Sequence, residues 1–213
     1  MGAGCIDFVL TEHPPAVTRV VERDYEDIRR RLERLAGMRV RSRCYADVGN
    51  FDGADAVVLS GSFAPWAVHD SAAITRLGED LAGFRGPVLG ICAGMQLLAM
   101  FAGGAVARRA RPDVGFGPVA VVGIDGLLAG LGPTVTVYKH HADDVVAVPD
   151  EFVVLARSED CAVEAFSAPG RLWWGTQFHP ERFDAEHPDG AFVLRNFFAL
   201  AGAWEPPVLL EHE

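Results

Sequence analysis

Residues 86–107 read GPVLGICAGMQLLAMFAGGAVA and contain no Asp, Glu, Lys or Arg. An uncharged run of this length is long enough to cross a bilayer as a helix. However, Pro87, Gln96 and five glycines interrupt the run, and the chain has no second segment like it. A buried parallel strand that leads directly into a buried helix has the same composition. We therefore predict a strand over 87–92 and a helix over 93–102, and no membrane span.

Strands and helices alternate along the chain before this run. Continuous apolar segments predict strands, and apolar residues at helical spacing predict helices. The predicted strands cover 5–10, 38–45 and 55–61, and the predicted helices cover 16–36 and 70–82. This alternation is typical of a parallel sheet with helices on both faces.

After Gly103 the pattern changes to short β-rich segments separated by turn residues. Such segments predict further strands, several of them antiparallel, that continue or flank the sheet. We expect them at 116–124, 134–140, 151–158, 161–167 and 172–178, with a closing helix at 189–203. The chain is thus predicted to be a single α/β domain with a mostly parallel central sheet flanked by helices and additional strands in its C-terminal half. The domain is expected to cover residues 1–204, followed by a tail at 205–213.

The composition excludes several classes of protein. Half of the residues are hydrophobic and 23% are charged, which is enough apolar material for a sizeable core and excludes a disordered chain. The net charge of −10 argues against binding to nucleic acid or to an anionic membrane, because phosphate groups would be repelled. The N-terminus lacks the basic and apolar regions of a secretory signal, so we expect a cytoplasmic protein.

The first candidate for chemistry is Gly90-Ile91-Cys92-Ala93-Gly94. A G-x-C-x-G segment between a buried strand and a helix has the form of a nucleophile elbow, where a sharp turn exposes the nucleophile. Amide groups at the helix N-terminus would favour the thiolate of Cys92 by about 0.3–1 kcal/mol. The alternative is a small buried cysteine with a packing role.

The second candidate is Gln177-Phe178-His179-Pro180-Glu181, which follows an apolar strand. A thiol nucleophile needs a base, and the base needs a group that orients it. In an extended segment His179 and Glu181 project to the same side, so the carboxylate can hold one imidazole nitrogen while the other faces the thiol. The alternative is an exposed loop histidine beside a solvated glutamate.

The third candidate is the loop Leu59-Ser60-Gly61-Ser62-Phe63-Ala64-Pro65, which follows a predicted strand. Parallel sheets build their sites at the carboxyl ends of strands. A loop there can supply a second backbone N–H to an oxyanion hole, beside that of Ala93. The alternative is an ordinary turn.

Taken together, the three segments resemble the class I glutamine amidotransferases, the triad glutaminases. GICAGMQ resembles the family's nucleophile segment, LWWGTQFHPE its terminal signature and VVLSGS its oxyanion loop. The segments at 113–121 and 141–149 are similar to two further stretches of the family. The methionine in GICAGMQ looks closest to the GMP-synthetase-type branch. The resemblance spans most of the chain and implies the flavodoxin-like architecture of these glutaminases.

The resemblance implies a role for each matching residue. Cys92 would be the nucleophile, His179 the general base and then acid, and Glu181 the residue that orients His179. The amides of Ser62 and Ala93 would form the oxyanion hole. The substrate would be bound by Gly61, Gln96 and His141. This chain departs from the family where Ser62 replaces a glycine, where Ala93 is unusually small, and in the segment 63–66.

Adjacent histidines at 140 and 141, with Asp143 nearby, raise the question of a metal site. Neighbouring residues on a strand point to opposite faces, and no further ligand cluster is evident. We therefore expect no metal and no cofactor, and the resemblance suggests a pocket or interface role for His141 and Asp143.

The implied function is hydrolysis of the glutamine side-chain amide through a γ-glutamyl thioester, supplying ammonia to a separate synthase. No part of the sequence resembles a module that activates an ammonia acceptor, so a synthase partner is expected. Two alternatives stay open: a hydrolase of γ-glutamyl amides or peptides that acts without a partner, and a regulatory subunit without catalytic activity.

Overall fold

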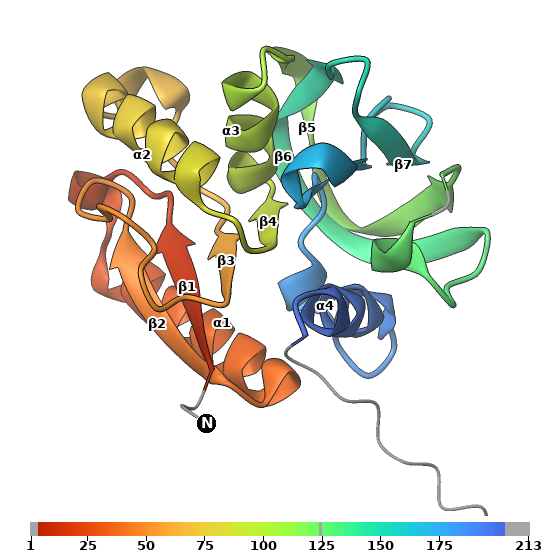
Figure 1. Cartoon of the computed structure of the whole chain (residues 1–213). Coiled ribbons are helices and arrows are strands. Elements are labelled where there is room, and N and C mark those ends of the chain that lie inside the picture. The colour runs from red at the N-terminus through yellow and green to blue at the C-terminus, as the bar shows by residue number, and fades with distance from the viewer. Residues whose placement is uncertain (1–3, 124, 203–213) are drawn as a thin grey trace, which may run out of the picture.

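The computed structural model describes residues 4–123 and 125–202 (Figure 1). Within this part of the chain, the strands form one nine-stranded sheet in the order β2-β1-β3-β4-β9-β8-β7-β5-β6. The first five strands in that order are parallel: β2 (Arg39–Cys44), β1 (Cys5–Leu10), β3 (Ala56–Leu59), β4 (Val88–Ile91) and β9 (Trp173–Thr176). The remaining four pair antiparallel: β8 (Ala165–Ala168), β7 (Val153–Arg157), β5 (Ala105–Val121) and β6 (Thr134–Ala147). The sheet is therefore mixed, as predicted.

In the part of the chain that the structure describes, four α-helices cover the two faces of the sheet (Figure 1). They are α1 (Arg19–Ala36), α2 (Ser71–Gly83), α3 (Ala93–Phe101) and α4 (Asp189–Leu200). Successive side chains of β3 enter different core clusters, because side chains alternate across a strand. Val58 packs in the cluster that contains α1 and α4, whereas Val57 and Leu59 pack in the cluster of α2 and α3.

Helix α1 begins three residues later than predicted, at Arg19 instead of residue 16. Residues Pro14–Ala16 form a separate 3-10 turn, and the hydroxyl oxygen of Thr18 accepts the N–H of Val21 as an N-cap. The predicted end of this helix at residue 36 is confirmed, and Gly37 directly after it has the left-handed conformation (φ 65°) that glycine adopts without strain.

The uncharged run is divided between β4 and the buried helix α3, as predicted. Within 4–123 and 125–202, no helix is both long enough and apolar enough to cross a membrane. A cytoplasmic location stays a prediction.

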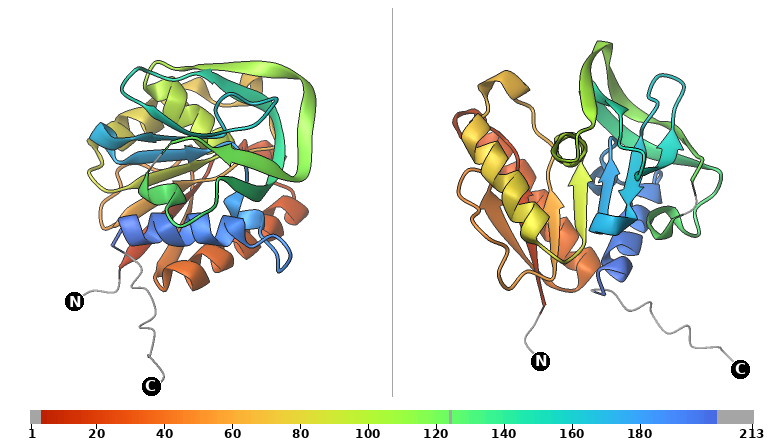
Figure 2. Two further views of the ribbon diagram at one scale, coloured as in Figure 1. Left: turned by 90° about the vertical axis from the view of Figure 1, so that its right-hand side faces the viewer. Right: turned by 45° about the horizontal axis from the view of Figure 1, so that its top comes forward.

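The strands of the C-terminal half differ most from the sequence analysis. Strand β5 starts at Ala105, well before the predicted segment at 116–124, and pairs with β6 through two register shifts. Figure 2 shows the two as a long, curved pair. The early part of β5 was missed because many of its side chains are exposed and polar, so it lacks the alternation that marks a strand. Ile124 and the predicted tail at 205–213 lie outside the described residues.

Candidate active site

Cys92 lies in a strained turn between β4 and α3, with φ 52° and ψ −106°. A non-glycine residue in this region costs about 1–3 kcal/mol and persists only where its surroundings hold it. Close packing of backbone atoms around this turn requires glycine at positions 90 and 94, on either side of Cys92. A Cβ atom on Gly90 would lie 2.5 Å from the carbonyl of Gly94, and one on Gly94 would lie 2.6 Å from that of Leu59. The predicted elbow is therefore present in the structure.

His179 and Glu181 follow β9 and reach the same place from the other side. The N–H of His179 donates to the carbonyl oxygen of Tyr138 in β6 (2.7 Å). The imidazole Nδ1 lies 2.7 Å from Oε1 of Glu181, whose side chain is buried. The reason given from the sequence was wrong in one respect: residues Pro180–Arg182 form a 3-10 turn, so the pair is joined by a turn and not by an extended strand.

Burial and charge act in opposite directions on this pair. Burial by itself lowers the pKa of His179, but the charge of Glu181 and the thiol of Cys92 outweigh it and hold that pKa well above its ordinary value. For Glu181, burial by itself raises the pKa, but the interaction with the imidazole of His179 outweighs the effect of burial and lowers that pKa. Nε2 of His179 is buried and makes no hydrogen bond that meets the distance and angle limits within 4–123 or 125–202.

The loop after β3 lies close to both His179 and Cys92. A Cβ atom on Gly61 would lie 2.8 Å from Cε1 of His179 and 3.5 Å from Cβ of Cys92. Only glycine allows the backbone to come this close to the imidazole. The serine that departs from the family pattern has a local partner, because Oγ of Ser62 donates to Oε1 of Glu12 (2.9 Å).

A pocket of about 330 Å³ opens above Cys92. Its lining contains every site residue that the sequence analysis singled out: Gly61, Ser62, Cys92, Ala93, Gln96, His141, His179 and Glu181. The amide of Gln96 is held on both sides, since its Nε2 donates to the carbonyl oxygen of Asp143 (2.8 Å) and its Oε1 accepts the indole N–H of Trp66 (2.9 Å). The pocket is therefore lined by a thiol, an imidazole and oriented amide groups.

Sequence reasoning noted Trp66 only as part of the departing segment 63–66, and it missed Thr11 and Glu12, which follow β1. Both residues after β1 are buried and hydrogen-bond to the loop at 60–64. A signal existed for this pair: two polar residues directly follow a buried strand, at the sheet edge where α/β proteins build their sites.

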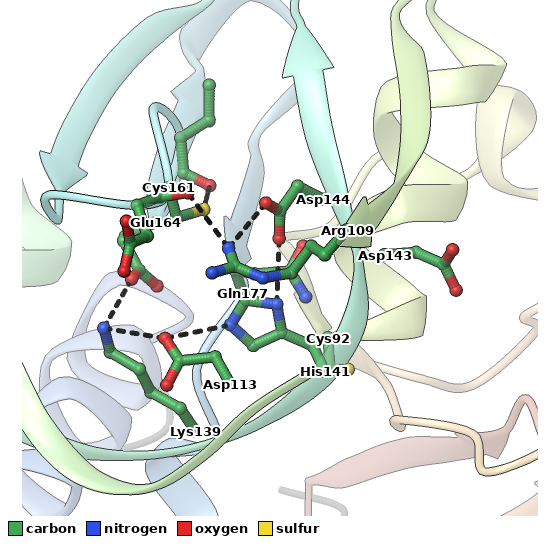
Figure 3. A network of polar contacts seen from close by, with 12 residues as sticks. Cys92, Arg109, Asp113, Lys139, His141, Asp143, Asp144, Cys161, Glu164 and Gln177 are labelled. Carbon is green, nitrogen blue, oxygen red and sulfur yellow. Dashed lines mark hydrogen bonds and ion pairs between the residues drawn. The ribbon is translucent and has the colours of Figure 1, made fainter. Parts of the chain in front are cut away.

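His141 lines the pocket and also belongs to a polar network that Figure 3 shows. Its Nδ1 lies 2.9 Å from Oδ1 of Asp144, and the other oxygen of that carboxylate binds Arg109 (2.7 Å). His140, by contrast, is exposed, although both histidines line the pocket. Asp113 lies 3.9 Å from Nε2 of His141 and links it to the rest of the network.

The network contains a group of metal-ligand types, Asp113, His141 and Glu164, with donor atoms within 4.8 Å of one another. The chain's only lysine already supplies positive charge there: Nζ of Lys139 lies 2.9 Å from Glu164 and 3.2 Å from Asp113. Burial lowers the pKa of Lys139, but the two carboxylates outweigh it and raise that pKa, so the ammonium form is favoured. This donor set suits a built-in ammonium group, and the absence of a metal stays a prediction.

A strained cysteine turn and a histidine–glutamate pair thus meet at one pocket of a mixed sheet. The chain belongs to the class I glutamine amidotransferase family, because the family model described as glutamine amidotransferase class-I matches residues 28–201. This confirms the resemblance, and the chain is an enzyme of that class.

Two relatives and one solved structure refine the comparison. The chain is 33% identical over 159 residues to a subunit of the glutamine-hydrolyzing GMP synthase of Thermoplasma acidophilum, covering 74% of this chain and 78% of the relative. It is 36% identical to the longer glutamine-hydrolyzing GMP synthase of Porphyromonas gingivalis, covering 76% of this chain but 32% of the relative. A crystal structure of a GMP synthase subunit protein from Thermoplasma acidophilum superposes with a TM-score of 0.80 at 27% identity, covering 95% of this chain and 96% of the other. This similarity confirms the predicted fold class.

Proposed function

We propose that this protein is the glutaminase subunit of a two-subunit GMP synthase, and that it hydrolyses glutamine to supply ammonia to a separate synthase subunit. The observation that carries the proposal is the juxtaposition of Cys92, His179 and Glu181 at one pocket, in a chain that resembles a GMP synthase subunit over most of its length. The chain matches 78% of the length of a relative that is named a subunit of GMP synthase, which supports a subunit role.

In the proposed reaction, His179 takes the thiol proton through Nε2, and Sγ of Cys92 attacks the side-chain amide carbon of glutamine. The same proton then passes to the leaving nitrogen, the C–N bond breaks and ammonia departs. A γ-glutamyl thioester remains on Cys92. His179 next activates a water molecule, which attacks the thioester and releases glutamate and the free thiol.

Glu181 and two backbone amides complete this mechanism. Glu181 keeps the proton of His179 on Nδ1, so that Nε2 can serve as the base. The N–H groups of Ser62 and Ala93 stabilise the oxyanion that forms at each tetrahedral stage. Gly61, Gln96 and His141 line the same pocket and bind the substrate.

The two alternative functions receive less support. A hydrolase of larger γ-glutamyl amides would need room beside Cys92, but the side chain of Trp66 lines the pocket and is fixed there by its hydrogen bond to Gln96. A regulatory subunit would not require an assembled pair of imidazole and carboxylate next to a strained cysteine.

The test is glutamate release by the wild-type protein and by Cys92→Ala, each measured alone and with the synthase subunit of a two-subunit GMP synthase. We expect wild type to release glutamate and to support GMP formation, and Cys92→Ala to do neither with glutamine. With ammonium salt as the nitrogen source, Cys92→Ala should still permit GMP formation by the complex. No glutamate release by wild type with a competent synthase subunit would contradict the proposal, and faster turnover of bulky γ-glutamyl amines would favour the partner-independent hydrolase.

A further inference from the structure

The carbonyl oxygen of Gly61 is surrounded by hydroxyl groups. It lies 2.9 Å from the hydroxyl of Tyr25, 3.1 Å from that of Thr11 and 2.7 Å from that of Ser60. All three of these residues are buried, so water does not compete for the carbonyl. Tyr25 comes from α1, whereas Ser60 is the neighbour of Gly61 in the chain, so Tyr25 anchors the loop to a separate element.

This anchor determines where the next amide points. In a trans peptide the C=O and N–H groups point in opposite directions. With the Gly61 carbonyl directed to Tyr25, the N–H of Ser62 points the other way. The peptide lies against the nucleophile, since a Cβ atom on Gly61 would be 3.5 Å from Cβ of Cys92. Within 4–123 and 125–202, no protein acceptor takes the Ser62 N–H.

The other end of the loop is held by Glu12. Its carboxylate accepts the N–H groups of Phe63 (2.6 Å) and Ala64 (3.1 Å) and the hydroxyl of Ser62 (2.9 Å). Rotating the Gly61–Ser62 peptide would therefore strain a loop that is hydrogen-bonded on both sides. It would also turn a carbonyl oxygen toward the position of the oxyanion, where two partial negative charges would repel each other.

We propose that Tyr25 is a positioning residue that keeps the oxyanion hole open by holding the Gly61 carbonyl away from Cys92. This inference deepens the proposed function and rests on it. Tyr25 does not contact the reacting atoms: it acts through the Gly61–Ser62 peptide, and Thr11 assists it from the segment after β1.

The test is Tyr25→Phe, with Tyr45→Phe as a matched control. Tyr45 is also a buried tyrosine whose hydroxyl hydrogen-bonds to backbone, in this case accepting the N–H of Asp70 (3.1 Å). Within 4–123 and 125–202, its hydroxyl makes no hydrogen bond to the loop at 60–64. Measured with the synthase subunit present, Tyr25→Phe should lower kcat for glutamine about tenfold, less than the 10²–10³-fold typical for loss of an oxyanion donor. KM should change less than twofold, and Tyr45→Phe should behave like wild type.

Two thiol reagents separate positioning from a general structural role. Iodoacetamide alkylates Cys92 by direct displacement, so its rate should be unchanged in Tyr25→Phe. A glutamine-shaped chloromethyl ketone reacts through a tetrahedral oxyanion, so its rate should fall about as much as kcat. Should Tyr25→Phe fold poorly, Thr11→Val removes a second hydroxyl and should shift the same ratio of rates by a smaller factor.

Equal losses with both reagents, or a kcat within twofold of wild type, would overturn the inference. Failure of the proposed function looks different: wild type itself would release no glutamate, and Cys92→Ala would not differ from it.

Discussion

Replacing Glu181 by glutamine removes the charge that orients His179 while nearly preserving the shape of the side chain. Oε1 of Glu181 lies 2.7 Å from Nδ1 of His179, and the glutamate side chain is 3% exposed, so solvent screens the interaction little. A hydrogen bond to a charged group contributes about 1.5–3 kcal/mol. If that stabilisation is lost when His179 carries the extra proton, kcat should fall by roughly 10- to 150-fold, since 1.36 kcal/mol corresponds to a factor of ten.

The assay is steady-state glutamate release by the complex with the synthase subunit. Glu33→Gln is the control, because this carboxylate accepts a hydrogen bond from Arg29 on the exposed side of α1. Circular dichroism and denaturant unfolding would establish that Glu181→Gln is folded. A kcat within threefold of wild type for a folded Glu181→Gln would refute the argument that the carboxylate holds the imidazole during the reaction.

Three further predictions concern buried groups. Gly90→Ala should lower the free energy of unfolding by at least about 3 kcal/mol in denaturant titrations and should abolish glutamate release. The reason is that the new Cβ would lie 2.5 Å from backbone atoms. A stable, active variant would contradict the geometry of the elbow. Lys139→Met should cost about 3–5 kcal/mol by the same measurement, because it leaves the fully buried Glu164 without its partner, and adding Glu164→Gln should recover part of the loss. Because the pKa of His179 is raised in the folded protein, this group stabilises the fold fully below its ordinary pKa of 6.5, and the stabilisation is lost as the pH rises through the raised pKa. Because the pKa of Glu181 is lowered, this carboxylate stabilises the fold above its ordinary pKa of 4.5. Glu181→Gln should therefore destabilise the protein more at pH 6 than at a pH high enough to deprotonate His179, and a destabilisation independent of pH would contradict this pairing.

Much of the parallel half of the fold could be predicted from the sequence. The apolar runs of β1, β3 and β4 are buried on both faces, and such runs are visible without knowing their neighbours. The early part of β5 could not be predicted in this way. Its exposed arginines carry no periodic signal, and its strand conformation comes from pairing with β6.

The site divides in a similar way. Cys92 and the His179–Glu181 pair were found from short motifs because the elbow and the turn each need particular residue types within five positions. Their meeting at one pocket, 87 positions apart in the sequence, follows from the parallel pairing of β4 with β9. The resemblance to a family indicated this meeting, and the strand order provides its physical cause.

By itself the sequence determined the α/β class, the parallel strands and helices of the first half and the residues of the candidate triad, because apolar periodicity and glycine placement are properties of neighbouring residues. Only the tertiary structure decided which way the Gly61–Ser62 peptide faces, which carboxylates form ion pairs with Lys139 and how far β5 extends. These features depend on hydrogen bonds and ion pairs between distant residues, such as the contact of Tyr25 with Gly61 across 36 positions. A local sequence pattern cannot predict such a contact, because the two partners are brought together only when the sheet and its helices pack.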